Sequence, residues 1–241
     1  MLGCDGSFPG PRGAGSGYLV QTPSTAVWLD AGPGTFANIQ WLGDPKVIDA
    51  VVLTHEHPDH CSDVESFAVW LAHTGHPPVR VYAPPGVRRR SYHADDPVLE
   101  WIEVEPGFRV VLGDLACSFV ATDHGPPTLA VRVDVEGASG SGRPDRALAY
   151  SADTGPGWSV EELGSGIGTV LCEASYTRGD EGHLRHLSGR QAGSMAADAA
   201  VGRLVVTHRW PTVSSTALAD EAAEAFGRGV EQAAVGRVFA W

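Results

Sequence analysis

The side chains best suited to chemistry lie in one short segment of the sequence. Within six residues it holds His55, His57, Asp59 and His60, and it directly follows an apolar, β-branched run over 50–54. Imidazole nitrogens and carboxylate oxygens are ordinary ligands of zinc-like cations. The spacing of His55 and His57 lets a tight, non-helical loop aim both rings one way, so that Asp59 and His60 can reach a second ion. A polar surface loop is the alternative, but with ten histidines in the chain this order is not expected by chance.

Three further candidate ligands each follow a predicted strand. Loops gather at strand ends and commonly form binding sites, so polar side chains there can converge although they are distant in sequence. Taken singly, each would be an ordinary polar or turn residue. The three are His124, Asp153 and His208, which follow the strands predicted over 117–122, 146–151 and 204–207.

The order of these residues resembles a known family. The motif His-x-His-x-Asp-His over 55–60, placed after a strand, is similar to that of the metallo-β-lactamase superfamily, and Asp30 in Trp-Leu-Asp-Ala-Gly resembles the family's first motif. The resemblance spans residues 1–241, which we predict to form a single domain. It implies an α+β fold, an αββα sandwich of two mixed β-sheets with helices on the outer faces and metals at one edge of the sheets.

The resemblance also implies a role for each candidate. Asp30 resembles a residue that holds the ligand loop from behind. The implied cofactor is a pair of Zn²⁺ ions, with Mn²⁺ or Fe²⁺ as alternatives. The implied ligands are His55, His57 and His124 for the first metal, Asp59, His60 and His208 for the second, and Asp153 as the bridge between them.

Two adjacent cations suit the chain to hydrolysis. They lower the pKa of a shared water molecule towards neutrality, which supplies a hydroxide nucleophile, and they neutralise charge on the attacked oxygen. Asp59 can accept a hydrogen bond from that hydroxide and orient it. We therefore predict that Asp59 is catalytic as well as a ligand.

A leaving group still needs a proton or a positive partner, and His186 is the candidate. It precedes an alanine-rich helix predicted over 188–200, for which Ser188 is a plausible N-cap. The stretch 186–192 resembles a histidine motif of the ribonuclease Z-like phosphodiesterase branch, where this histidine stabilises the transition state or protonates the leaving oxygen. His183 is the competing proton donor, but no predicted helix directly follows it.

Charge and length point to a small substrate. The net charge is −12, which disfavours general binding of a phosphate backbone. Ribonuclease Z grips transfer RNA with an extra arm, expected between the His124 and Asp153 motifs, and only 28 residues lie there. We predict a phosphodiesterase for small phosphodiesters such as cyclic nucleotides; nucleic acid is disfavoured as a partner, no membrane partner is expected, and a homodimer is possible.

Other functions of the same fold remain open as alternatives. An arylsulfatase, a lactonase or a ribonuclease Z-like RNA-processing nuclease would use a similar site. True β-lactamases of this fold usually lack a bridging aspartate, so Asp153 argues against them. Only 33 residues follow His208, too few for the helical domain of a glyoxalase-type thioesterase. A relative without activity would be expected to have lost a ligand, and all seven are present.

Composition and hydrophobic patterning indicate the compartment and the fold in which this site is expected. The chain is 43% hydrophobic, its four cysteines form no CxxC pair, and no stretch reaches the roughly 18 apolar residues of a membrane span. We therefore expect a cytoplasmic protein with reduced thiols. Four successive strands in the middle of the chain argue against a doubly wound parallel sheet. The main strands are predicted over 18–21, 26–29, 50–54, 79–82, 108–112, 117–122, 128–135, 146–151, 168–172, 204–207 and 237–241, and helices over 35–42, 62–73, 188–200 and 215–226.

Overall fold

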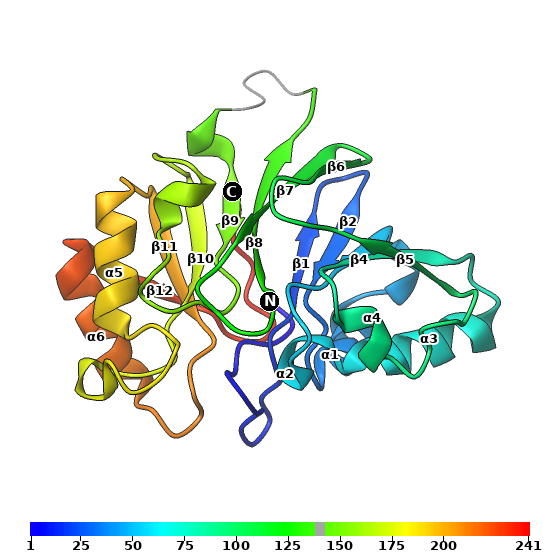
Figure 1. Cartoon of the computed structure of the whole chain (residues 1–241), viewed down its shortest axis with the longest axis horizontal. Coiled ribbons are helices and arrows are strands. Elements are labelled where there is room, and N and C mark those ends of the chain that lie inside the picture. The colour runs from blue at the N-terminus through cyan, green and yellow to red at the C-terminus, as the bar shows by residue number, and fades with distance from the viewer. Residues whose placement is uncertain (138–142) are drawn as a thin grey trace.

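Two β-sheets pack face to face in the computed structural model, which describes residues 1–137 and 143–241 (Figure 1). In this part of the chain the first sheet has five strands in the order β1-β2-β3-β4-β5. β1 and β2 are antiparallel, whereas β2 to β5 run parallel. The strands are β1 Tyr18–Gln21, β2 Ala26–Leu29, β3 Ala50–Val52, β4 Val79–Ala83 and β5 Leu99–Glu103.

The second sheet is also mixed, and within the described residues it has seven strands in the order β12-β11-β10-β9-β8-β7-β6. β6 to β9 form an antiparallel meander, and β9 to β12 are parallel. The strands are β6 Arg109–Leu112, β7 Leu115–Ala121, β8 Leu129–Val135, β9 Leu148–Tyr150, β10 Thr169–Glu173, β11 Arg203–Thr207 and β12 Glu231–Gln232.

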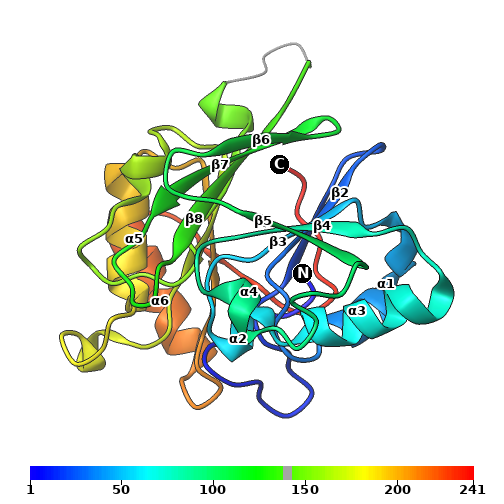
Figure 2. The same ribbon diagram turned by 45° about the vertical axis from the view of Figure 1, so that its right-hand side comes forward.

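Helices cover the outer face of each sheet, which makes four layers. Figure 1 and Figure 2 show α1 and α3 against the first sheet and α5 and α6 against the second. The α-helices are α1 Thr35–Leu42, α2 Pro58–Cys61, α3 Asp63–Thr74, α4 Val87–Arg90, α5 Gly189–Asp198 and α6 Ser215–Phe226, and short 3-10 helices span Pro45–Val47, Pro144–Arg146, Val160–Leu163 and Arg178–Asp180. The predicted α+β (αββα) fold class is confirmed.

Apolar patterning explains why these layers form. In α3 the buried side chains Val64, Phe67, Ala68 and Leu71 recur at helical spacing, which produces one apolar stripe facing the sheet. Strand β3 is buried along its whole length, as expected for a parallel strand covered on both faces. Between the sheets, apolar side chains of β1 and β2 meet those of β7 to β11 in one shared core.

Most predicted elements occur where the sequence placed them, and the last one is wrong. The segment 237–241 is not a strand: Val238 is exposed, and Phe239 and Trp241 pack against the core between the sheets without strand pairing. The sequence prediction also missed β5, an edge strand whose side chains are mostly part-exposed and which therefore lacks a continuous apolar run.

The described residues contain no helix that is long and apolar enough to cross a membrane. All four cysteines are unpaired: Cys117 and Cys172 are buried, and Cys4 and Cys61 are partly exposed.

Candidate metal centre

The seven predicted ligands come together at one end of the sandwich, although they are spread over 154 residues of sequence from His55 to His208. Each lies in the segment that follows the carboxyl end of a strand, Asp59 and His60 in the short helix α2 and the others in loops. The first sheet contributes the loop after β3, and the second contributes the loops after β7, β9 and β11. The site therefore lies where loops from both sheets meet.

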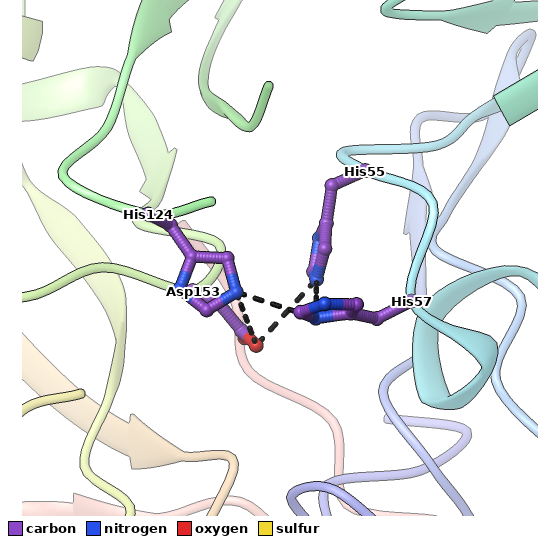
Figure 3. A group of neighbouring side chains, drawn as sticks. All are labelled: His55, His57, His124 and Asp153. Carbon is purple, nitrogen blue, oxygen red and sulfur yellow. Dashed lines mark hydrogen bonds and ion pairs between the residues drawn. The ribbon is translucent and has the colours of Figure 1, made fainter. Parts of the chain in front are cut away.

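One set of ligand atoms faces a common point (Figure 3). His55 Nε2 lies 3.0 Å from His57 Nδ1, and His124 Nε2 lies 3.3 Å from the same His57 atom. Asp153 Oδ2 completes the set at 3.6 Å from His55 and 3.8 Å from His124. Figure 3 shows His55 and His57 entering from one loop, with His124 and Asp153 entering from the opposite side. We call His55, His57 and His124 the open group, because His57 is partly exposed.

A second set lies directly beside the first. Asp59 Oδ2 is 3.5 Å from His60 Nε2 and 3.3 Å from His208 Nε2. The other oxygen of Asp153, Oδ1, lies 3.1 Å from His60 Nε2 and 3.2 Å from His208 Nε2. We call Asp59, His60 and His208 the buried group, because all three side chains are shielded from solvent. The Asp153 carboxylate thus presents one oxygen to each group.

The imidazole rings are held from behind by hydrogen bonds on their outward nitrogens. His60 Nδ1 lies 2.8 Å from Asp30 Oδ2, and His208 Nδ1 lies 2.9 Å from Ser175 Oγ. His55 Nδ1 contacts Thr54 Oγ1, and His124 Nδ1 faces the Arg185 carbonyl oxygen at 3.3 Å. Such contacts fix ring orientation and leave each inward Nε2 available as a ligand.

Asp30 is the centre of the buried hydrogen-bond network behind the site. Its carboxylate accepts bonds from the Thr54 backbone amide, the Thr54 hydroxyl and the Tyr150 hydroxyl, in addition to its contact with His60. Asp30 and His208 both have left-handed backbone conformations, with φ of 54° and 55°. Non-glycine residues adopt this region at a cost of roughly 1–3 kcal/mol, so the surrounding structure must hold them there.

The donor set fits a cation by its unpaired atoms and by its spacing. His60 Nε2 and Asp153 Oδ1 are buried and have no hydrogen-bond partner, because their contact lacks hydrogen-bonding geometry. Two ligands held tetrahedrally at zinc–nitrogen bond lengths lie about 3.3–3.4 Å apart, close to the spacings found here. Side chains that leave buried polar atoms facing one another in this way suit a shared positive ion.

Charge in the site leads to the same conclusion. Burial lowers the pKa of His55 well below its ordinary value, and this favours the neutral ring that a ligand requires. Burial also disfavours a charge on His60, but Asp153, Asp30 and Asp59 together raise the pKa of that ring well above its usual range. The carboxylates around His60 therefore demand a positive charge, which a metal cation would supply.

His186, the predicted proton donor, lies beside both groups. Its ring centroid is 5.3 Å from that of His124 and 5.3 Å from that of His208. His186 Nδ1 is 2.9 Å from Glu173 Oε1. Burial works against the charged ring, but Glu173 raises the pKa of His186 to about 9, so the ring carries a proton at neutral pH.

The sequence prediction overlooked Glu173. It is fully buried at the end of β10, and it also accepts hydrogen bonds from the Thr154 and Leu187 backbone amides and the Ser175 hydroxyl. A charged residue that ends an apolar strand is the same signal that marked Asp153, so the sequence did contain a clue.

The loop that carries His186 ends at Ser188, the residue that the sequence predicted as the N-cap of the next helix. Ser188 caps α5: its hydroxyl accepts from the Gln191 amide, and the Gln191 side chain accepts from the Ser188 amide. His183, the competing proton donor, is exposed, and among the described residues its side chain contacts none of the predicted ligands. The geometry brings His186 to the site and leaves His183 outside it.

Comparison with known proteins agrees with this description. A family model described as beta-lactamase superfamily domain matches residues 25–209. An uncharacterized protein of Mycobacterium leprae is 34% identical, with 99% of this chain and 87% of that protein covered. Ribonuclease Z of Mycobacterium marinum is 28% identical, with 88% and 86% covered.

Solved structures show the same architecture. The metallo-β-lactamase fold protein YhfI of Bacillus subtilis superposes with a TM-score of 0.87 at 23% identity, over 99% of this chain and 96% of that one. A diphosphatase of the PhnP family gives a TM-score of 0.73 at 20% identity, over 96% and 92%. The fold and the His/Asp cluster define a metal-dependent hydrolase class, and the chain belongs to the β-lactamase superfamily with the metallo-β-lactamase fold.

Proposed function

We propose that this chain is a binuclear metal-dependent phosphodiesterase for small phosphodiesters such as cyclic nucleotides. The observation that carries the proposal is the position of Asp153, which directs Oδ1 towards the buried group and Oδ2 towards the open group. A carboxylate placed between two sets of histidines in this way is suited to bridge two ions.

The donors are imidazole nitrogens and carboxylate oxygens, which suit zinc and also accept manganese or iron(II). His55, His57 and His124 would hold one ion, and Asp59, His60 and His208 the other, with Asp153 shared. Two such ions activate a water molecule near neutral pH and neutralise charge on the attacked phosphoryl group.

The chain's own residues provide the remaining parts of the reaction. Asp59 would accept a hydrogen bond from the attacking water and orient it towards phosphorus. His186 would donate its Nε2 proton to the leaving oxygen as the bond from phosphorus to that oxygen breaks. Glu173 holds the His186 ring through Nδ1, so it acts as a positioning residue.

Several observations favour a small phosphodiester over the alternatives. A protonated histidine beside the two groups serves a poor leaving group such as a ribose oxygen, which departs slowly without a proton. The relatives include a ribonuclease Z and a diphosphatase, both named for cleaving phosphoryl bonds. The net charge of −12 and the 28 residues between His124 and Asp153 disfavour transfer RNA as the substrate.

A substrate panel tests this proposal. Metal-loaded protein should be assayed on bis-p-nitrophenyl phosphate, cyclic nucleotides, an aryl sulfate, a lactone, a β-lactam and precursor transfer RNA. We expect turnover of the phosphodiesters and little of the rest. Faster turnover of the sulfate or the lactone would replace the proposed function with that activity, and efficient, specific cleavage of transfer RNA would show that the predicted substrate size is wrong.

A further inference from the structure

The N-terminal loop is fastened directly to the buried group. The Ser7 amide donates to Asp59 Oδ2 at 2.7 Å, and the Gly6 amide donates to the Arg209 carbonyl at 3.0 Å. A Cβ atom on Gly6 would lie 2.3 Å from the carbonyl oxygen of His208, so only glycine permits this approach. Phe8 follows these anchors, and its ring is 50% exposed. These contacts therefore hold the backbone next to Phe8 in place beside the site.

A second fastened loop stands beside the open group. The Tyr176 hydroxyl donates to the carbonyls of Leu184 and His186, and the Arg185 carbonyl faces His124 Nδ1. The Arg185 side chain is exposed, and its guanidinium lies near Gly125, the residue after His124. Among the described residues this guanidinium has no hydrogen-bond or ion-pair partner.

The two loops project from the same end of the molecule as the ligand-bearing loops (Figure 1, Figure 2). One contacts the buried group and the other contacts the open group, and Asp153 lies between the groups. The backbones that carry Phe8 and Arg185 therefore flank the centre, one beside each group.

These two side chains have complementary chemistry. An exposed aromatic ring on a fixed backbone offers a flat face on which a planar ring can stack. An unpaired guanidinium forms strong, directional hydrogen bonds to phosphate oxygens, and on a chain of net charge −12 it supplies local attraction for an anion.

We propose that Phe8 and Arg185 are specificity-determining residues, and that the substrate is a nucleoside phosphodiester whose base contacts Phe8 while its phosphate contacts Arg185. This inference rests on the proposed phosphodiesterase function and deepens it by assigning the group attached to the phosphate. A surface phenylalanine with no partner is the alternative that the experiment must exclude.

Calorimetry with two ligands that differ only in the base provides the test. Adenosine 5′-monophosphate and ribose 5-phosphate should be titrated into zinc-loaded protein. Stacking of one base contributes about 5- to 150-fold in affinity, so we expect the nucleotide to bind tighter by that factor. Phe8→Ala should remove the difference and Phe8→Tyr should retain it, since the tyrosine ring keeps the flat face.

Matched variants separate this effect from general damage. Trp41→Ala removes another exposed aromatic ring, 72% exposed on α1, and should leave the preference unchanged. Arg185→Met should weaken both ligands by about 10-fold, because both contain the phosphate. Arg80→Met, which removes an exposed arginine on β4, should weaken neither.

Hydrolysis of 3′,5′-cyclic AMP adds the kinetic readout. Phe8→Ala should raise KM by the same factor as it weakens nucleotide binding and leave kcat within about threefold, since base contacts bind substrate and transition state alike. Equal binding of the two ligands by the wild-type protein, or a preference that survives Phe8→Ala, overturns the inference and leaves the proposed function standing. Protein that cleaves no phosphodiester contradicts the proposed function itself.

Discussion

The open and buried groups share Asp153 but differ in how the protein surrounds them. In the buried group, His60 and His208 are fully buried, and their outward nitrogens contact Asp30 and Ser175. In the open group, His57 is partly exposed, and the outward nitrogen of His124 contacts a backbone carbonyl at the longer distance of 3.3 Å.

This difference in burial and in polar partners suggests different roles for the buried group and the open group. Buried ligands with polar partners hold an ion in a fixed geometry, because ring orientation and charge are both set by the protein. A partly exposed ligand such as His57 leaves access for water and for a substrate oxygen. We therefore expect the buried group to retain its ion longer, and the open group to face the incoming phosphodiester.

The largest effect should come from the residue common to both groups. Asp153→Asn removes the negative charge that serves both ions, so both should bind weakly. Activity should fall by about 10³-fold or more, as expected when several kcal/mol of charge stabilisation are lost. Metal content and phosphodiester turnover measure this. Asp145→Asn, at an exposed ion pair with Arg143, is the matched control and should change neither. A variant that keeps two ions and full activity would show that Asp153 does not bridge them.

The comparison between groups predicts two phases of metal loss. When zinc-loaded protein is mixed with excess chelator, one ion should leave quickly from the open group and the other slowly from the buried group. His57→Ala should abolish the fast phase and His208→Ala the slow one, each with about one ion lost per chain. A single phase for two ions in the wild-type protein would mean that the two environments are equivalent.

His186 contacts both groups but belongs to neither, so its removal should separate catalysis from metal binding. His186→Ala should keep both ions and lose about 10²–10⁴-fold in turnover of substrates with alkoxide leaving groups. The loss should be smaller for p-nitrophenyl esters, because p-nitrophenolate departs without protonation. Equal losses on both substrate classes would exclude the role of proton donor, and loss of an ion would identify His186 as a ligand.

Asp30 should act mainly on the buried group, because it contacts His60 directly and reaches His55 only through Thr54. Asp30→Asn weakens the support of His60 Nδ1 and turns one acceptor of the Thr54 and Tyr150 hydrogen bonds into a donor. Replacement of such supporting residues typically costs 10–100-fold in metal affinity or activity, and we expect about that loss in the slow chelation phase, with a smaller change in the fast phase. Asp49→Asn, which alters a similar backbone cap on the Ala26 amide away from the site, should have no effect on either phase.

The smallest effect concerns the loop behind the open group. Arg90 pairs with Glu56 at 2.9 Å, but the arginine side chain is 56% exposed. Solvent screens an ion pair in which the arginine is exposed, so Arg90→Ala should lower the free energy of unfolding only slightly and leave chelation unchanged. Urea denaturation measures the change, and a larger loss would show that this pair helps to hold the ligand loop.

Sequence reasoning brought together seven candidate ligands because each has a local signature. The segment His55–His60 is dense in ligand types, and His124, Asp153 and His208 each follow an apolar strand. The sandwich followed from the periodic apolar runs and from the family resemblance. These signals are local in the chain, so they can be read without knowledge of which strands lie side by side.

The features that the sequence did not reveal depend on contacts between distant segments. Glu173 matters because β10 brings it to His186, and Tyr150 because it reaches Asp30. The close approach of Gly6 to His208 likewise cannot be predicted from the sequence. The tail over 237–241 has strand-like composition, and only the structure shows that its apolar side chains pack against the core without strand pairing.

The central claim is that one carboxylate joins two metal positions of unequal burial. An anomalous difference map, recorded at the zinc absorption edge from crystals of zinc-loaded protein, tests it directly. The account predicts two peaks per chain on either side of the Asp153 carboxylate, one among His55, His57 and His124 and the other among Asp59, His60 and His208. A single peak, or two peaks that leave Asp153 in contact with only one of them, would contradict it.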